Sequence, residues 1–424
     1  FALTAYDENG QEQTVPLNPS LLTVPGGTQY ARIGTELFGI TPDIPPKLSW
    51  IEATSDQLAG SFFTFGSSDL KMLDGAVTQS RPSRKLWFTR PLSASLPGEP
   101  EESAEVHISL INPMEDPVEL TLSLIQDDET LSETNRTIAA KGMLYSTVED
   151  LFGSQNLPGD GYLEVKVTEG NGVIGFSRVD YPLAKTTLGL NAAEPSSAET
   201  LYSAQLASGP GVAGTGMETH IKLVNPMENQ REVIFTAVAE DGTLLAEPVS
   251  RIIEGRTAAE FKAWELFNFE GDSAVGSLVI EANAGGIVGD VIFTPFEGIE
   301  YAAALPLQAR PVTEAVFNHI ANSDEIYTGL AFFNPGEEEA QITVIAKRGD
   351  GTEAGTRVLT LGAGERISRT LADPDMLPAT TSLLNGFISI ISTQPIICQQ
   401  LYGGTDLQFL AAVPPTTGYG SMFE

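Results

Sequence analysis

Three stretches of this chain repeat one pattern: HISLINPMEDPVELTLSLIQDDETL at 107–131, HIKLVNPMENQREVIFTAVAEDGTL at 220–244 and GLAFFNPGEEEAQITVIAKRGDGTE at 329–353. Each stretch places an Asn-Pro pair between two runs in which apolar and polar residues alternate. Alternation with a period of two is typical of half-buried antiparallel strands. Because proline cannot donate to a strand ladder, we expect each Asn-Pro pair to end a strand at a loop or bulge.

The spacing of these pairs gives the size of the repeat. Asn112, Asn225 and Asn334 lie 113 and 109 residues apart, which is the length of one β-sandwich domain. A second marker recurs as Leu37-Phe38, Leu151-Phe152 and Leu266-Phe267, with a weaker fourth copy at Met376-Leu377. This marker extends the repeat to four units, and we expect it to form one short helical turn whose apolar side chains plug the core.

A third marker is a glycine that opens an alternating strand, at Gly60, Gly161, Gly276 and Gly386, and a further strand follows it through Val173, Val288 and Ile397. Hairpin turns are predicted at Asn9-Gly10, Asp127-Asp128, Asp241-Gly242 and Asp350-Gly351. Asn, Asp and Gly tolerate the positive φ of tight turns. Strands and turns thus recur in one order along the chain.

With about seven strands in each stretch of roughly 110 residues, the markers predict an all-β protein of four tandem Ig-like antiparallel β-sandwich repeats, the first of them N-terminally incomplete. Blades of a β-propeller would be about half as long. The predicted units span 1–85, 86–198, 199–312 and 313–424, with linkers near 78–85, 193–200 and 307–314.

The first unit begins late in the repeat, since its Asn-Pro pair would fall just upstream of Phe1, and Met422-Phe423 matches the start of unit four at Val316-Phe317. An incomplete sandwich leaves a strand edge unpaired, which is costly unless something fills it. Three explanations stay open. The chain is a piece of a longer array, a neighbouring subunit donates a strand and builds a head-to-tail fibre, or the first unit is a degenerate cap.

The charge of the chain excludes one class of partner. It contains 23 Lys and Arg against 56 Asp and Glu, a formal net charge of −33, which would repel a nucleic-acid backbone. No run approaches the roughly 20 apolar residues of a membrane-spanning helix, so no membrane span is predicted. The acidic balance, together with the repeats, favours an extracellular location.

No sequence motif in the chain indicates a particular catalytic reaction. His107 and His220 occupy the same repeat position, so we interpret them as strand residues, and His319 near a junction has no nucleophile or orienting carboxylate around it in sequence. Cys398, the single cysteine, lies in the apolar run IICQQL and is interpreted as a small buried hydrophobe. The Gly-x-Ser-x-Gly elbow of serine hydrolases is absent. We therefore predict no catalytic or cofactor-binding residue and no enzyme.

Binding chemistry is limited to three kinds of residue. Carboxylates suit calcium, and they cluster at Asp127, Asp128 and Glu129 and at Glu337, Glu338 and Glu339, but neither cluster has EF-hand spacing. Asn135 begins an N-glycosylation sequon. Trp50, Trp87 and Trp264 occupy non-equivalent positions, which argues against a repeated sugar-binding platform.

The segments YSAQLASGPGVAGTGMETHIKLVNPMENQREVIFTAVAEDGTL at 202–244 and VFNHIANSDEIYTGLAFFNPGEEEAQITVIAKRGDG at 316–351 resemble tandem β-sandwich repeats of secreted and surface proteins of bacteria. The resemblance implies an extracellular or cell-surface location and a modular architecture, and carries over no catalytic residue. We expect a non-enzymatic structural protein of a fibre, filament or surface layer that contacts copies of itself or neighbouring surface proteins, by head-to-tail strand complementation at the first unit. The alternative is an adhesin, or a carbohydrate-binding array accessory to a secreted enzyme, which would contact glycans.

Overall fold

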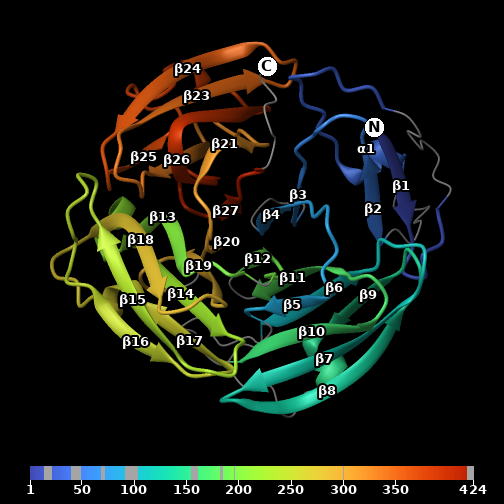
Figure 1. Cartoon of the computed structure of the whole chain (residues 1–424). Coiled ribbons are helices and arrows are strands. Elements are labelled where there is room, and N and C mark those ends of the chain that lie inside the picture. The colour runs from blue at the N-terminus through green and yellow to red at the C-terminus, as the bar shows by residue number, and fades with distance from the viewer. Residues whose placement is uncertain are drawn as a thin grey trace.

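The computed structural model of the chain describes residues 1–13, 22–39, 49–67, 72–90, 104–153, 161–181, 185–194, 196–298 and 300–417. Its strands form antiparallel sheets throughout, so the predicted all-β class is confirmed. In chain order the strands fall into four blocks, at 2–77, 85–191, 200–306 and 312–413 (Figure 1). None of the helices in these ranges is long and apolar enough to cross a membrane.

The second block consists of two four-stranded sheets around one core. One sheet has the order β5 (Lys85–Phe88), β10 (Tyr162–Glu169), β7 (Val118–Gln126), β8 (Glu129–Ile138). The other has the order β12 (Thr186–Asn191), β11 (Ile174–Tyr181), β6 (Glu105–Ile111), β9 (Met143–Thr147), and β9 leads into α2 (Val148–Phe152). Alternate side chains point to one face of each strand, so both sheets contribute to the same core, as Ile108 and Leu122 do.

The third block repeats this arrangement strand by strand. Its sheets have the orders β13 (Thr200–Ser208), β18 (Ala274–Ala282), β15 (Arg231–Val238), β16 (Val249–Ile253) and β20 (Ala303–Pro306), β19 (Val288–Thr294), β14 (Glu218–Asn225), β17 (Thr257–Lys262). The helix α3 (Ala263–Leu266) follows β17, and a 3-10 turn (Val212–Gly214) follows β13. The repeated strand order supports a β-sandwich architecture.

The fourth block differs in one strand. It contains β21 (Val312–Phe317), β22 (Ile326–Phe333), β23 (Ala340–Arg348), β24 (Glu353–Leu361), β25 (Arg366–Thr370), β26 (Gly386–Gly404), β27 (Leu410–Val413) and a 3-10 turn (Pro378–Thr380). The expectation of separate strands at Gly386 and Ile397 is wrong here, because β26 runs through both. The second and third blocks break at this point through Gly170, Gly172 and Gly286, which have positive φ, whereas the fourth block has no glycine there.

The first block has fewer strands than the others among the residues described. It contains β1 (Ala2–Tyr6) paired with β2 (Trp50–Thr54), β3 (Phe62–Gly66) paired with β4 (Leu73–Val77), and α1 (Gly34–Phe38). A strand follows Gly60 as predicted, but it is not the equivalent of the strands after Gly161 and Gly276. Thr64 lies opposite Gly75 as Arg178 lies opposite Gly189, so β3 is the equivalent of β11. Alternation alone cannot distinguish two neighbouring strands of similar pattern. Met422-Phe423 lies outside the described residues.

The predicted Leu-Phe plugs are confirmed. They coincide with α1, α2 and α3, and the apolar residues Phe38, Leu151 and Leu266 are buried. In the fourth block Met376 and Leu377 are buried immediately before the 3-10 turn. Each plug closes the end of its block.

The asparagine of the Asn-Pro pair clamps a loop in three blocks. The side chain of Asn225 is fully buried; Nδ2 donates to the carbonyls of Asn229, Ile253 and Glu254 at 2.9–3.1 Å, and Oδ1 accepts from the backbone N–H of Met227 at 3.1 Å. Equivalent sets of bonds are made by Asn112 and Asn334. The clamp ties the end of one strand to the loop after another, and the strands end there as predicted.

The last strands of the four blocks meet at the centre of the molecule (Figure 1). β4 contacts β12 and β27, and β20 contacts the same two strands, so the four strands close a cycle. The first and fourth blocks are therefore neighbours, and the backbone N–H of Gln29 donates to the carbonyl of Gly349 at 2.9 Å. The chain closes into a ring of four blocks.

The clamp makes a direct prediction about stability. Asn225→Asp keeps the acceptor oxygen but places a second oxygen against three carbonyls, so we expect the protein to lose about 3 kcal/mol or more of unfolding free energy. Thermal and urea unfolding measure the loss. The control, Asn229→Asp, changes an exposed side chain in the same loop and should be nearly neutral; equal effects of the two variants would contradict the clamp.

Candidate functional site at the junctions between blocks

At three junctions, a short segment at the end of the first strand of one block, or at a bulge within that strand, lies against a sheet of the next. Trp87, Tyr202 and Val316 hold equivalent places, because each forms a bridge with a residue just beyond the last strand of its block. The residues three positions later, Arg90, Gln205 and His319, therefore occupy equivalent positions too. The three segments 88–90, 203–205 and 317–319 are called plug segments below.

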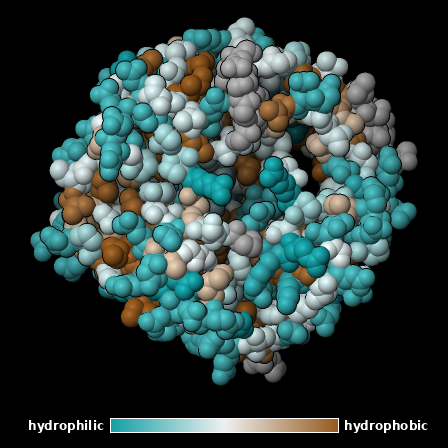
Figure 2. All heavy atoms as spheres, in the orientation of Figure 1, coloured by the Kyte–Doolittle hydropathy of each residue, from teal (hydrophilic) through white to brown (hydrophobic). Residues whose placement is uncertain are grey.

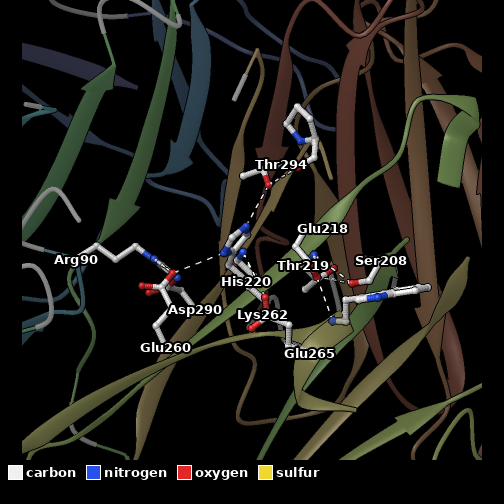
Figure 3. Close-up of polar contacts among 12 residues, drawn as sticks. Arg90, Ser208, Glu218, Thr219, His220, Glu260, Lys262, Glu265, Asp290 and Thr294 are labelled. Atoms are coloured by element: carbon white, nitrogen blue, oxygen red, sulfur yellow. Dashed lines mark hydrogen bonds and ion pairs between the residues drawn. The ribbon is translucent and has the colours of Figure 1, made fainter. Parts of the chain in front are cut away.

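The plug segment of the second block carries Arg90 into a buried polar network on the third block (Figure 3). Arg90 Nε donates to Asp290 Oδ1 at 2.5 Å and Nη1 to Glu260 Oε1 at 2.7 Å. Thr89 Oγ1 donates to Asp290 Oδ2 at 2.5 Å. Asp290 lies on β19 and Glu260 on β17, so a single arginine from one block pairs with two strands of the next.

The buried charges of this network balance. Lys222 on β14 is buried among them and lowers the pKa of Glu260, so two cations face two carboxylates. Burial alone would raise the pKa of Glu260, but Arg90 and Lys222 outweigh it and hold that pKa at about 2. Burial lowers the pKa of His220 to about 4, so His220 is neutral at pH 7. A balanced, hydrogen-bonded cluster can stay ionised away from water.

Polar residues next to the Arg90 network hold α3, the short helix of the third block (Figure 3). Glu218 Oε1 accepts from Ser208 Oγ at 2.8 Å and from the backbone N–H groups of Thr219 and Trp264 at 3.0 and 3.2 Å. Burial raises the pKa of Glu218, against these hydrogen bonds. His220 Nε2 lies 3.1 Å from Thr294 Oγ1. The Thr294 hydroxyl itself donates to the carbonyl of Pro295 at 2.9 Å, so these contacts position the backbone and the sheet.

The other two plug segments make different contacts in the same place. Ser203 Oγ donates to Gln399 Oε1 at 3.0 Å, and Arg366 Nη2 donates to Gln205 Oε1 at 2.6 Å. The His319 ring lies 5.9 Å from Phe62 of the first block. Ring closure thus uses the same geometry as the junctions along the chain.

At the centre, one carboxylate joins three blocks. Asp74 on β4 is fully buried and accepts from the backbone N–H of Gly189 on β12 at 2.7 Å and of Ala412 on β27 at 3.1 Å. Strands β12 and β27 are edges of their sheets, so these N–H groups have no ladder partner of their own. Burial raises the pKa of Asp74 to about 8, although these N–H groups and that of Gly75 favour the ionised form.

The histidines and the cysteine predicted to be structural lie in packed surroundings. His107 Nδ1 lies 2.9 Å from the Tyr145 hydroxyl, and its ring is stacked on that tyrosine. His319 packs between Phe62 and Tyr402, and burial lowers its pKa to about 4. Cys398 is fully buried, and burial raises its pKa to about 12. The interpretation of Cys398 as a buried hydrophobe is in accord with this burial.

The acidic loops do not form a metal cluster. Asp127 and Asp128 form the turn before β8 with positive φ and line an open groove of about 630 Å³ with Glu228 and Glu254 of the third block. Glu129 begins β8, Glu337, Glu338 and Glu339 are exposed before β23, and Asn135 is exposed on β8. Across the described ranges, no three His, Cys, Asp or Glu residues are grouped so that they could hold a metal ion.

The three tryptophans offer no exposed platform. Trp50 and Trp87 are 8% and 1% exposed, and Trp264 packs against Phe269 and Phe296. This placement weakens the carbohydrate-binding alternative insofar as it depends on tryptophan.

Sequence reasoning missed the residues that join the blocks: Arg90, Glu260, Asp290 and Asp74. The acids and bases of the Arg90 network are separated by up to 200 residues, and no spacing rule connects them. The sequence does indicate that Asp74 is unusual, because it is the one charged residue in the apolar stretch LDGAV. Comparison of the chain with protein-family models and with curated proteins gives no match, so the functional argument rests on geometry.

The Arg90 network predicts a large effect of removing its cation. Arg90→Met removes the guanidinium that pairs with buried Asp290 and half-buried Glu260, and we expect a loss of about 3–5 kcal/mol. Because the pKa of Glu260 is lowered, its stabilisation exists above its ordinary pKa and disappears as the pH falls toward 2. The stability advantage of the wild type over Arg90→Met should therefore be complete above the ordinary pKa of a glutamate and shrink as the pH falls toward 2. Arg81→Met changes an exposed arginine and is the control. Equal thermal midpoints of the two variants would refute the stabilising role of Arg90.

Asp74 predicts the opposite pH dependence. Its raised pKa means that its contribution is complete below about pH 4 and is lost as the pH rises through about 8. Each unit of pKa difference corresponds to about 1.4 kcal/mol. We expect the stability advantage of the wild type over Asp74→Asn, measured by urea unfolding, to shrink steadily between pH 4 and 8. A difference that is constant over this range would contradict the assignment.

Proposed function

We propose that the protein is a non-enzymatic extracellular structural protein that assembles with copies of itself, or with neighbouring surface proteins, through its first block. One observation carries the proposal. Within the described ranges, β2 pairs only with β1 and β3 pairs only with β4, whereas the equivalent strands β10 and β11 each pair on both sides. Among the residues described, β2 and β3 of the first block therefore each have one edge without a paired strand.

The surface around these edges is open. Figure 2 shows a mostly hydrophilic face that opens into a hollow over the first block, between the places where Figure 1 puts β2 and β3. Unpaired edges beside a hollow are templates for a strand from another chain. Because a contact of this kind joins different surfaces of two copies, it can propagate head to tail.

The modular form of the proposal includes the finer fold assignment. We take the four blocks to be Ig-like repeats of the kind found in bacterial surface proteins, supported by the recurring strand order and the three asparagine clamps. The acidic surface would keep such modules soluble and confine their contacts to specific edges. The structural role is preferred over glycan binding because the tryptophans are not exposed.

Assembly is tested on the full chain by sedimentation velocity over a wide concentration range, with negative-stain electron microscopy of the same samples. We expect oligomers that grow with concentration and appear as linear chains of particles. A single species with the mass of one chain, 45.2 kDa, at every concentration would overturn the proposal.

A further inference from the structure

The junction between the second and third blocks differs from the other three in its hairpin turn. The turns of Gly10, Gly242 and Gly351 pack directly against a loop of the next block, and a Cβ added to Gly10 or Gly351 would lie 1.9 or 2.6 Å from a backbone oxygen of that loop. Asp128 occupies the same position in the turn of the second block. Its side chain needs room that the other turns lack, and the open groove of about 630 Å³ lies beside it.

The groove spans the junction and is lined by carboxylates from both blocks. Asp127 and Asp128 come from the second block, and Glu228 and Glu254 come from loops of the third. Across the described ranges, no three acidic side chains are grouped so that they could hold one metal ion. The carboxylates therefore suit a cation whose charges are spread along a chain better than they suit one compact ion, which needs many oxygen ligands at once.

The cations already at the groove neutralise only part of this charge. Arg256 Nε lies 3.5 Å from Asp128 Oδ1, and Arg256 Nη1 lies 3.7 Å from Glu228 Oε1. The guanidinium of Arg231 donates to backbone carbonyls of its own block. The other two carboxylates of the groove form no ion pair within the described part of the chain. Because the Asp128 and Glu228 side chains are 69% and 80% exposed, their pairs with Arg256 are weak and a second cation can compete for them.

A buried hydroxyl without a hydrogen-bond partner lies next to the groove. Tyr162 is fully buried at the start of β10, and its hydroxyl has no partner among the residues described. Its ring belongs to an apolar cluster between the two blocks, against which Met227 packs, the residue before Glu228. Burial raises the pKa of Tyr162, and nearby carboxylates, those of Glu228 and Asp128 among them, raise it further. The hydroxyl therefore faces the acidic lining of the groove, where an ammonium group could donate to it.

We propose that this groove binds an aliphatic polycation, a chain that carries two or more ammonium groups several ångströms apart. One ammonium group would donate to the carboxylates of the turn and to the Tyr162 hydroxyl, and another would reach the carboxylates of the third block. Such groups occur in free polyamines and in runs of lysine side chains. Because the ligand contacts both blocks, its binding would stabilise their junction. The site lies apart from the strand edges of the first block and does not depend on the proposed assembly.

Spermidine is the first probe, and a trilysine peptide of the same net charge is the second. Each is titrated into the full chain by isothermal titration calorimetry, at low ionic strength and in physiological salt. We expect saturable binding of one ligand per chain and a rise in the thermal midpoint of the protein. Tighter binding of spermidine would support a free polyamine as the ligand, and tighter binding of trilysine would support the lysine side chains of another protein. Absence of saturable binding by both probes would overturn the proposal.

Two double variants separate the groove from the general charge of the chain. Asp127→Asn with Asp128→Asn keeps residues that tolerate the positive φ of this turn, and we expect the affinity for the tighter probe to fall about tenfold. Glu337→Gln with Glu338→Gln removes the same charge from an exposed cluster outside the groove and should leave the affinity unchanged. Equal affinities of both double variants would overturn the site, because the probe would then respond only to the net charge of −33.

A third variant tests the hydroxyl. Tyr162→Phe keeps the ring and removes the unpartnered group, so the free protein should keep its thermal midpoint while the affinity for the probe falls about threefold. An unchanged affinity would overturn the hydroxyl as part of the site. Calcium at the same ionic strength should not displace the bound probe, and displacement would overturn the polycation in favour of a metal ion.

Discussion

Four edge strands with unpaired backbone groups meet at the centre of this molecule, and the arrangement of its blocks depends on that meeting. β4, β12, β20 and β27 each end a block and each lie at the edge of a sheet. Small buried residues lie where β20 meets β27, since Ala303 and Ala412 belong to one core cluster. The Asp74 carboxyl group accepts hydrogen bonds from the backbone N–H groups of Gly189 and Ala412, which point away from their own sheets. An edge that would otherwise invite aggregation is thereby buried.

Closure of the ring explains why the junctions are alike in geometry and different in chemistry. The plug segments bring a guanidinium, an amide and an imidazole to equivalent places. In the next block the guanidinium meets carboxylates, the amide meets an arginine and the imidazole meets an aromatic ring. The repeat fixes where a side chain points, while the local partner decides whether it is charged, polar or aromatic.

The sequence predicts features that depend on local pattern and misses those that depend on closure. The strand alternation, the Leu-Phe plugs and the ends of strands at the Asn-Pro pairs follow from neighbouring residues, and the structure has them. The ring, the Arg90 network and the contacts of Asp74 join residues more than a hundred positions apart, as Gly189 and Asp74 show. Gly60 was assigned to the wrong strand because two adjacent strands share one alternation. The fold class can thus be predicted from the sequence, whereas the candidate site cannot.

A closed ring requires the first and fourth blocks to touch in solution. Spin labels on cysteines introduced at Gly26 and Asp350 would flank the contact of Gln29 with Gly349, while buried Cys398, with its raised pKa, stays unlabelled. Pulsed electron paramagnetic resonance on dilute protein measures the distance between the labels. The closed ring predicts one narrow distribution at short distance. A broad distribution at long distances would show that the four blocks form an open string.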